Sequence, residues 1–150
     1  MDSLSCLDIQ KKVLEILEND PVLSGYVKEF SIGGENTARK LFPCVTVAEV
    51  TNDIEPLCIG PGAPNLNRYR IVIRGGTRHT LPEIARRGDG AGKKGIVQLT
   101  DDIVAAIYPG NLEGIFKRTL HLEEACPMEI EGSGGKSWIT RVILTGNRKA

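Results

Sequence analysis

The spacing of hydrophobic residues predicts two amphipathic helices. The first lies between Ser5, which can cap a helix, and Pro21, which cannot continue one. Its apolar residues recur at i, i+4, i+7 and i+8, and they are Ile9, Val13, Ile16 and Leu17. The second helix ends at the sequence Tyr108-Pro109-Gly110. Its apolar stripe consists of Ile96, Leu99, Ile103, Val104 and Ile107. Each helix therefore has one face to bury.

Alternation of apolar and polar residues predicts strands in much of the remaining chain. The alternation is clearest in residues 68–74. One face of that strand would carry Tyr69, Ile71 and Ile73, and the other Arg68, Arg70, Val72 and Arg74. Residues 44–50 are nearly all apolar, which is typical of a central strand, and Cys44 is expected to be a small buried hydrophobe. Further strands are expected in residues 26–32, where alternation is weak, in 115–122 and in 138–145.

The expected strands are mostly joined directly, which predicts antiparallel pairing. Long loops are expected at about 51–67, 75–95 and 123–136, where glycine, proline or polar residues accumulate. Within the second loop, Thr80 to Glu83 has the spacing of a capping box and can open one or two helical turns. We therefore expect a single α+β domain over residues 1–150, with two amphipathic helices packed on a mostly antiparallel, twisted sheet.

Charge is balanced over the whole chain but not along it. Nineteen Lys and Arg residues match nineteen Asp and Glu residues, so the molecule has no net field to attract a polyanion. The segment 68–94, in contrast, contains eight basic residues and only Glu83 and Asp89 as acids. The basic residues are Arg68, Arg70, Arg74, Arg78, Arg86, Arg87, Lys93 and Lys94. They form either a solvated strand face and loop or a surface that contacts phosphates.

The sequence predicts no catalytic, metal or cofactor site, and hence no enzyme. The four cysteines form no Cys-x-x-Cys pair. Neither Gly88–Lys94 nor Gly135–Ser137 has the glycine spacing and the strand–loop–helix context of a phosphate-binding loop. The acidic pairs Asp101-Asp102 and Glu123-Glu124 are interpreted as solvated. The N-terminus has no signal peptide, and no apolar run is long enough to span a membrane.

The order of these features resembles the tail terminator, or tail-completion, proteins of long-tailed bacteriophages, which are also called minor tail proteins. The resemblance includes the helix exit Asn19-Asp20-Pro21-Val22-Leu23 and the strand entry Phe42-Pro43-Cys44-Val45-Thr46-Val47. It continues through the Arg68–Arg74 strand, the helix Ile96–Ile107 and the strands Leu112–Leu122 and Trp138–Leu144.

The resemblance implies a virion component, assembled in the host cytoplasm, that closes into a six-subunit ring on the finished tail tube. Its implied partners are other copies of itself, the tail tube protein and the head–tail connector, with no membrane. A head–tail joining (neck) protein and a generic protein-binding module remain alternatives. The eight basic residues would then line or flank the channel and contact genome DNA non-specifically, pair with acids of a neighbouring subunit, or be simply solvated.

Overall fold

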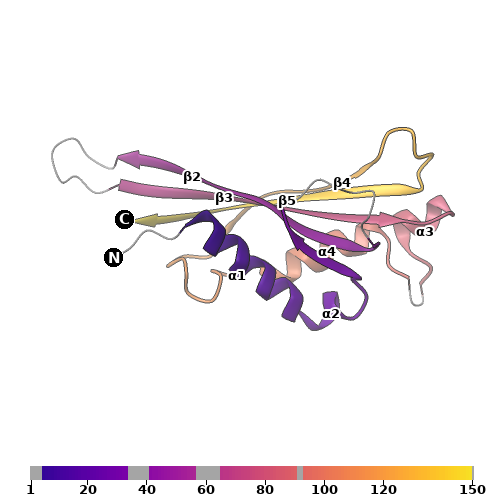
Figure 1. Ribbon diagram of the computed structural model, residues 1–150, viewed down its shortest axis with the longest axis horizontal. Coiled ribbons are helices and arrows are strands. Elements are labelled where there is room, and N and C mark those ends of the chain that lie inside the picture. The colour runs from indigo at the N-terminus through magenta and orange to yellow at the C-terminus, as the bar shows by residue number, and fades with distance from the viewer. Residues whose placement is uncertain (1–4, 34–40, 57–64, 91–92, 150) are drawn as a thin grey trace.

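The computed structural model describes residues 5–33, 41–56, 65–90 and 93–149, and its centre is one five-stranded sheet with the order β1-β2-β3-β5-β4. The strands are β1 (Glu29–Ile32), β2 (Cys44–Pro56), β3 (Asn65–Arg78), β4 (His121–Glu129) and β5 (Ser137–Lys149). The helices are α1 (Cys6–Asn19), α2 (Pro21–Ser24), α3 (Pro82–Arg87) and α4 (Ile96–Ile107). Figure 1 shows α1, α2 and α4 on one side of the sheet and α3 at one end of it.

The sheet is mixed, and the α+β class is confirmed. Strands β2, β3, β5 and β4 pair antiparallel, as expected, but β1 pairs with β2 in parallel. The expectation of direct, antiparallel joining was therefore wrong for β1. A parallel pair requires a crossover of about a dozen residues, and eleven residues separate Ile32 from Cys44. The connection is thus long enough to return the chain to the same end of the sheet.

The two predicted amphipathic helices are confirmed, and their ends have the predicted causes. The Ser5 hydroxyl accepts a hydrogen bond from the Asp8 N–H at 3.1 Å at the start of α1. Asp20 ends α1 and caps α2, because its carboxylate accepts from the Leu23 N–H at 3.0 Å. Helix α4 has the bounds that its apolar stripe predicted. Gly95 precedes α4 where a Cβ atom would lie 2.4 Å from the Arg86 carbonyl group, so only glycine fits.

The core lies between the helices and one face of the sheet. Tyr69, Ile71 and Ile73 of β3 are fully buried on this face, as the alternation predicted. The Tyr69 and Phe116 rings pack edge to face with centroids 5.8 Å apart. Fully buried helix residues that pack on this face are Ile9, Val13, Leu17, Ile96, Leu99 and Ile103. Cys44 is buried, as predicted.

Two predicted loops are partly strand. The segment 51–67 lies in β2 up to Pro56 and in β3 from Asn65, and residues 57–64 are outside the described residues. The segment 75–95 continues β3 to Arg78 and then forms α3. The glycines misled the prediction, since Gly75 and Gly76 pair with Thr140 and Ile139 inside the sheet. Helix α3 begins without a side-chain cap, so Thr80 to Glu83 is not a capping box.

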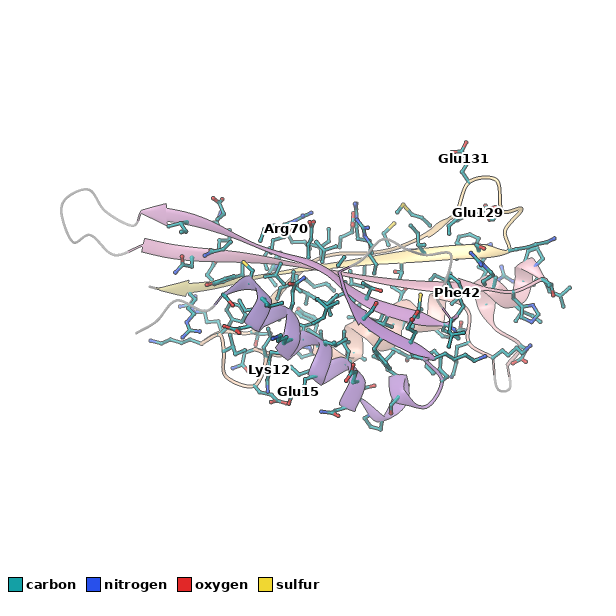
Figure 2. All side chains as sticks on the ribbon, viewed as in Figure 1. Lys12, Glu15, Phe42, Arg70, Glu129 and Glu131 are labelled. Atoms are coloured by element: carbon teal, nitrogen blue, oxygen red, sulfur yellow. The ribbon has the colours of Figure 1, made fainter. Side chains whose placement is uncertain are left out.

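The predicted strand at 115–122 is instead mostly a turn, and the predicted loop at 123–136 begins as strand β4. Leu112 and Glu113 have positive φ angles of 53° and 55°, which reverse the chain there. The hydrophobic residues of the turn, Leu112, Phe116 and Leu120, are buried in the core. Lys12 on α1 holds the turn through an ion pair with Glu113 and also pairs with Glu15 on its own helix (Figure 2).

Candidate functional site

The eight candidate basic residues fall into separate groups in the structure. Arg68, Arg70 and Arg74 alternate with the buried residues of β3 and are exposed on the face that no helix covers, as predicted. We call this the open face, and Figure 2 shows Arg70 on that side of the sheet. Arg78, Lys93 and Lys94 lie instead around a cleft at the end of β3. The eight residues therefore do not make one continuous basic surface along the strand.

Carboxylates neutralise part of the open face. The Arg70 Nε lies 4.0 Å from Glu123 Oε2 on β4. Arg141 of β5, the register partner of Arg74, holds Glu124 with two contacts, Nε to Oε2 at 2.6 Å and Nη2 to Oε1 at 3.3 Å. The hydrogen bonds from the guanidinium keep the pKa of Glu124 below its ordinary value. Glu123 and Glu124 were interpreted as solvated acids. Glu123 is exposed, as interpreted, whereas the structure corrects the interpretation of Glu124, because Arg141 binds it.

Two apolar side chains are buried on the open face without a helix above them. Val72 is 2% exposed and its partner across the sheet, Ile143, is 4% exposed. Their neighbours along the two strands are Arg70, Arg74 and Arg141. The methylene groups of arginine can cover apolar surface while the guanidinium stays in water. Arginines at these neighbouring positions are thus suited to cover Val72 and Ile143 while they keep their charge in water.

The second group lines a cleft of about 310 Å³ at the end of the sheet. Its walls come from five parts of the chain: residues 26–28, 42–43, 77–79, α3 and 93–94. Its cationic lining residues are Lys28, Arg78, Lys93 and Lys94, and all four are exposed. Among the residues that the structure describes, no carboxylate forms an ion pair with any of the four. The cleft therefore gathers four cations in one concave place, and Asp102, held by the Tyr26 hydroxyl, is an acid beside its wall.

Aromatic rings and hydrogen bonds fix the position of the charges around the cleft. The Arg78 guanidinium lies 4.5 Å from the centre of the Phe42 ring, and its Nε donates to the Ser137 hydroxyl at 3.2 Å. The Lys94 ammonium lies 5.9 Å from the centre of the Tyr26 ring. Lys93 Nζ is 3.1 Å from His79 Nε2. The cleft therefore has aromatic walls and a cationic rim.

Tyr26 also corrects an expectation about α4. Its hydroxyl donates to Asp102 Oδ2 at 2.6 Å, so Asp102 is not a solvated acid but links the cleft wall to the helix. Burial, followed by this hydrogen bond, raises the pKa of Tyr26. Asp101, the other member of the pair, is exposed.

Arg86 and Arg87 lie at the end of α3, outside the cleft lining. The Arg86 guanidinium is 5.7 Å from the centre of the Trp138 ring, and Arg87 pairs with Glu83 of the same helix at 3.9 Å. Both arginines are in the last turn, where a cation is favoured by the helix dipole. Contacts of α3 and its helix dipole therefore account for the positions of Arg86 and Arg87, without a role in the cleft.

The glycine-rich segments lie in different contexts. Gly88–Lys94, of which residues 91–92 are outside the described residues, follows α3 rather than a strand. Gly135 and Lys136 lead into β5. Within the described residues, no group of three or more His, Cys, Asp or Glu side chains is placed to hold a metal ion. No helix in the described ranges is long and apolar enough to cross a bilayer.

Sequence reasoning missed Lys28, Tyr26 and Phe42 as members of the cleft. They belong to a weakly alternating segment and to a short stretch before β2, and neither carries a motif that indicates a binding site. Parallel pairing of β1 with β2 brings them together, since the Lys28 N–H donates to the Pro43 carbonyl at 2.9 Å. Only the topology could have revealed this grouping.

Comparison with known proteins gives a structural match but no sequence match. No protein-family model matches the sequence, and no curated protein does. A chain of the solved structure "Virion of native gene transfer agent (GTA) particle" has a similar fold, with a TM-score of 0.59 and 13% sequence identity. The similarity covers 99% of this chain and 100% of that chain. The two chains therefore share a fold over essentially their whole lengths.

Proposed function

We propose that this protein is a structural component of a phage-like virion that closes into a ring on the end of the tail tube. The observation that carries the proposal is the shared fold, over both full lengths, with a chain of a gene transfer agent virion. The resemblance of the sequence to tail terminator proteins supports the finer role: the ring ends tube growth and offers the head connector a surface. The protein has no catalytic role in this proposal.

The edges of the sheet support assembly through side chains rather than through a continued sheet. Strand β1 has only four residues. Strand β4 has Pro127, which lacks an N–H, and a register shift between Leu122 and Glu124. Short strands, proline and bulges are features that prevent uncontrolled pairing between sheet edges. These features argue for contacts between subunits through side chains.

The open face suits a surface that turns toward DNA without gripping it. Arg70 and Arg141 are each near a carboxylate, so the positive charge on this face is partly neutralised. A surface of this kind makes weak phosphate contacts without reading sequence. If the ring surrounds a channel, genome DNA could pass this face.

Electron microscopy of growing tail tubes tests the proposal. Tube protein is polymerised with and without the purified chain, and tube lengths are measured. A terminator shortens the tubes and places a ring, expected to contain six subunits, at one end. Binding to the connector without an effect on tube length would assign the neck role, and binding to neither would contradict a place in the virion.

A further inference from the structure

The cleft at the end of β3 and an acidic turn at the same end of the sheet, across β5, are complementary in charge. The turn joins β4 to β5 and carries Glu129 and Glu131 (Figure 2). Both carboxylates are exposed, and in the described part of the chain neither makes an ion pair. The cleft has four cations without carboxylate partners. Each patch therefore lacks the charge that the other has.

Both patches also present apolar side chains. Met128 and Ile130, beside the glutamates, are exposed by 40% and 37%, although both are large hydrophobic residues. The cleft offers Tyr26, Phe42 and Pro43 as partly buried walls. Binding cavities for compact ligands have volumes of roughly 300–1,000 Å³, and the cleft, at about 310 Å³, lies at the lower end of this range. It has room for one or two side chains of the turn, and the others would lie on its rim. A broad DNA duplex would meet only the rim.

The two patches are different surfaces at one end of the sheet. Thr77 of β3 and Glu129 of β4 both pair with Trp138, so only β5 lies between the strand of the cleft and the strand of the turn. The cleft lies on the β1 side of β3, next to the start of β2, whereas Glu129 belongs to the opposite edge strand, β4. A contact between two different surfaces of identical subunits is head-to-tail, and it generates a ring when its rotation closes. A contact between the two patches is therefore of the head-to-tail kind from which rings are built.

We propose that the basic cleft of one copy receives the Met128–Glu131 turn of the next copy. The inference rests on the proposed ring, and it names the contact that builds it. Lys28, Lys93 and Lys94 pair with Glu129 and Glu131, while Met128 and Ile130 pack on Tyr26 and Phe42. The charges select the partner surface and the register, and the apolar residues are covered on assembly.

Carbodiimide cross-linking tests this contact even when assembly is weak, because it joins a lysine and a carboxylate that touch. Equal amounts of ¹⁴N- and ¹⁵N-labelled protein are mixed, cross-linked and analysed by mass spectrometry. We expect peptide pairs of mixed isotope that join Lys28, Lys93 or Lys94 to Glu129 or Glu131. Only contacts between separate molecules give mixed pairs. Absence of these pairs, or cross-links from the cleft to other acids alone, would overturn the proposal.

Charge reversal sharpens the test. Lys93→Glu with Lys94→Glu, or Glu129→Lys with Glu131→Lys, should each abolish the mixed pairs, since like charges then face each other. A mixture of the two variants should restore them, because the acidic cleft of one meets the basic turn of the other. The matched control is Lys117→Glu with Arg118→Glu, two exposed cations outside the cleft lining, which should leave the pairs unchanged.

The tube assay separates this contact from the proposed function. Cross-linking without tube capping would remove the terminator role and retain the contact. Capping that survives both charge reversals would retain the role and refute the contact. Fluorescence anisotropy with a short DNA duplex tests the remaining alternative, that the cleft binds phosphates of DNA. If Lys93→Glu with Lys94→Glu weakens DNA binding while the mixed-isotope pairs are absent in the unmodified protein, the cleft is a phosphate site and the proposal fails.

Discussion

Residues 68–74 of strand β3 point alternately to the two faces of the sheet, and the two faces are stabilised in different ways. On the covered face, Tyr69, Ile71 and Ile73 are fully buried against helices. On the open face, Arg70 is exposed and lies near Glu123, and Val72 is buried without a helix above it. Burial of apolar area dominates stability, whereas exposed ion pairs contribute little. The comparison indicates that one face fixes the fold and the other is free to serve interactions.

Truncating side chains at adjacent positions of β3 should give the largest difference in the free energy of unfolding between the two faces. Ile71→Ala leaves a cavity in the core and should lower the free energy of unfolding by about 2–5 kcal/mol, and Ile103→Ala on α4 should do the same. Arg70→Ala should change it by about 0.5 kcal/mol or less. Urea denaturation measures all three variants. Similar midpoints would mean that the faces do not differ as described.

Adding a methyl group to each face compares how tightly they are packed. A Cβ atom on Gly75 would lie 3.0 Å from both Leu99 and Thr140, inside the core, so Gly75→Ala should cost about 1–3 kcal/mol. A Cβ atom on Gly76 would meet the edge of the half-buried Phe42 ring at 3.0 Å. That ring can shift, so Gly76→Ala should cost less than Gly75→Ala. Thermal unfolding decides the order, and a larger loss for Gly76→Ala would contradict it.

The sequence predicted the covered face better than any other part. Periodicity alone located α4 and the alternation of β3, because each pattern repeats over several turns or residue pairs. It failed at residues 112–119, where Leu112 and Phe116 are as apolar as strand residues but enter the core from a turn with positive φ angles. It also failed at β1, whose parallel pairing depends on the path of a connection rather than on local residues.

The candidate site was predictable only in part, for the same reason. The shared face of Arg68, Arg70 and Arg74 follows from alternation within one strand. The cleft does not, because Lys28, Arg78 and Lys94 belong to separate segments that only the folded sheet brings together. The partners of Glu124 and Asp102 lie on other elements, so these acids looked solvated in the sequence. Long-range contacts leave no local signal.

The hydrogen bond between Tyr26 and Asp102 gives the cleft wall a pH dependence. Burial raises the pKa of Tyr26 above its ordinary value near 10. The folded state thus retains the proton that the unfolded chain releases, so this contribution is complete below pH 10 and is lost as the pH rises further. Chemical denaturation between pH 8 and pH 11 should show the loss. Tyr26→Phe should reduce it, and an identical slope in that variant would contradict the assignment.

The smallest effect is expected at the open-face pair of Glu124 and Arg141. Hydrogen bonds from the Arg141 guanidinium lower the pKa of Glu124. The pair therefore stabilises the fold fully at a pH above the ordinary glutamate pKa. This stabilisation is lost as the pH falls through the lowered pKa. Because both side chains are more than a third exposed, at 42% and 34%, water and salt screen the interaction. Titration of the Glu124 carboxyl by NMR should give a pKa below the ordinary glutamate value, and high salt should move the pKa toward that value. Arg141→Gln should remove the difference while changing the denaturation midpoint little, since Ile143 and Val72 keep their strand contacts. A large loss of stability in Arg141→Gln would show that packing stabilises the open face as it does the covered one. The methylene groups of Arg141 would then cover the apolar residues of the open face.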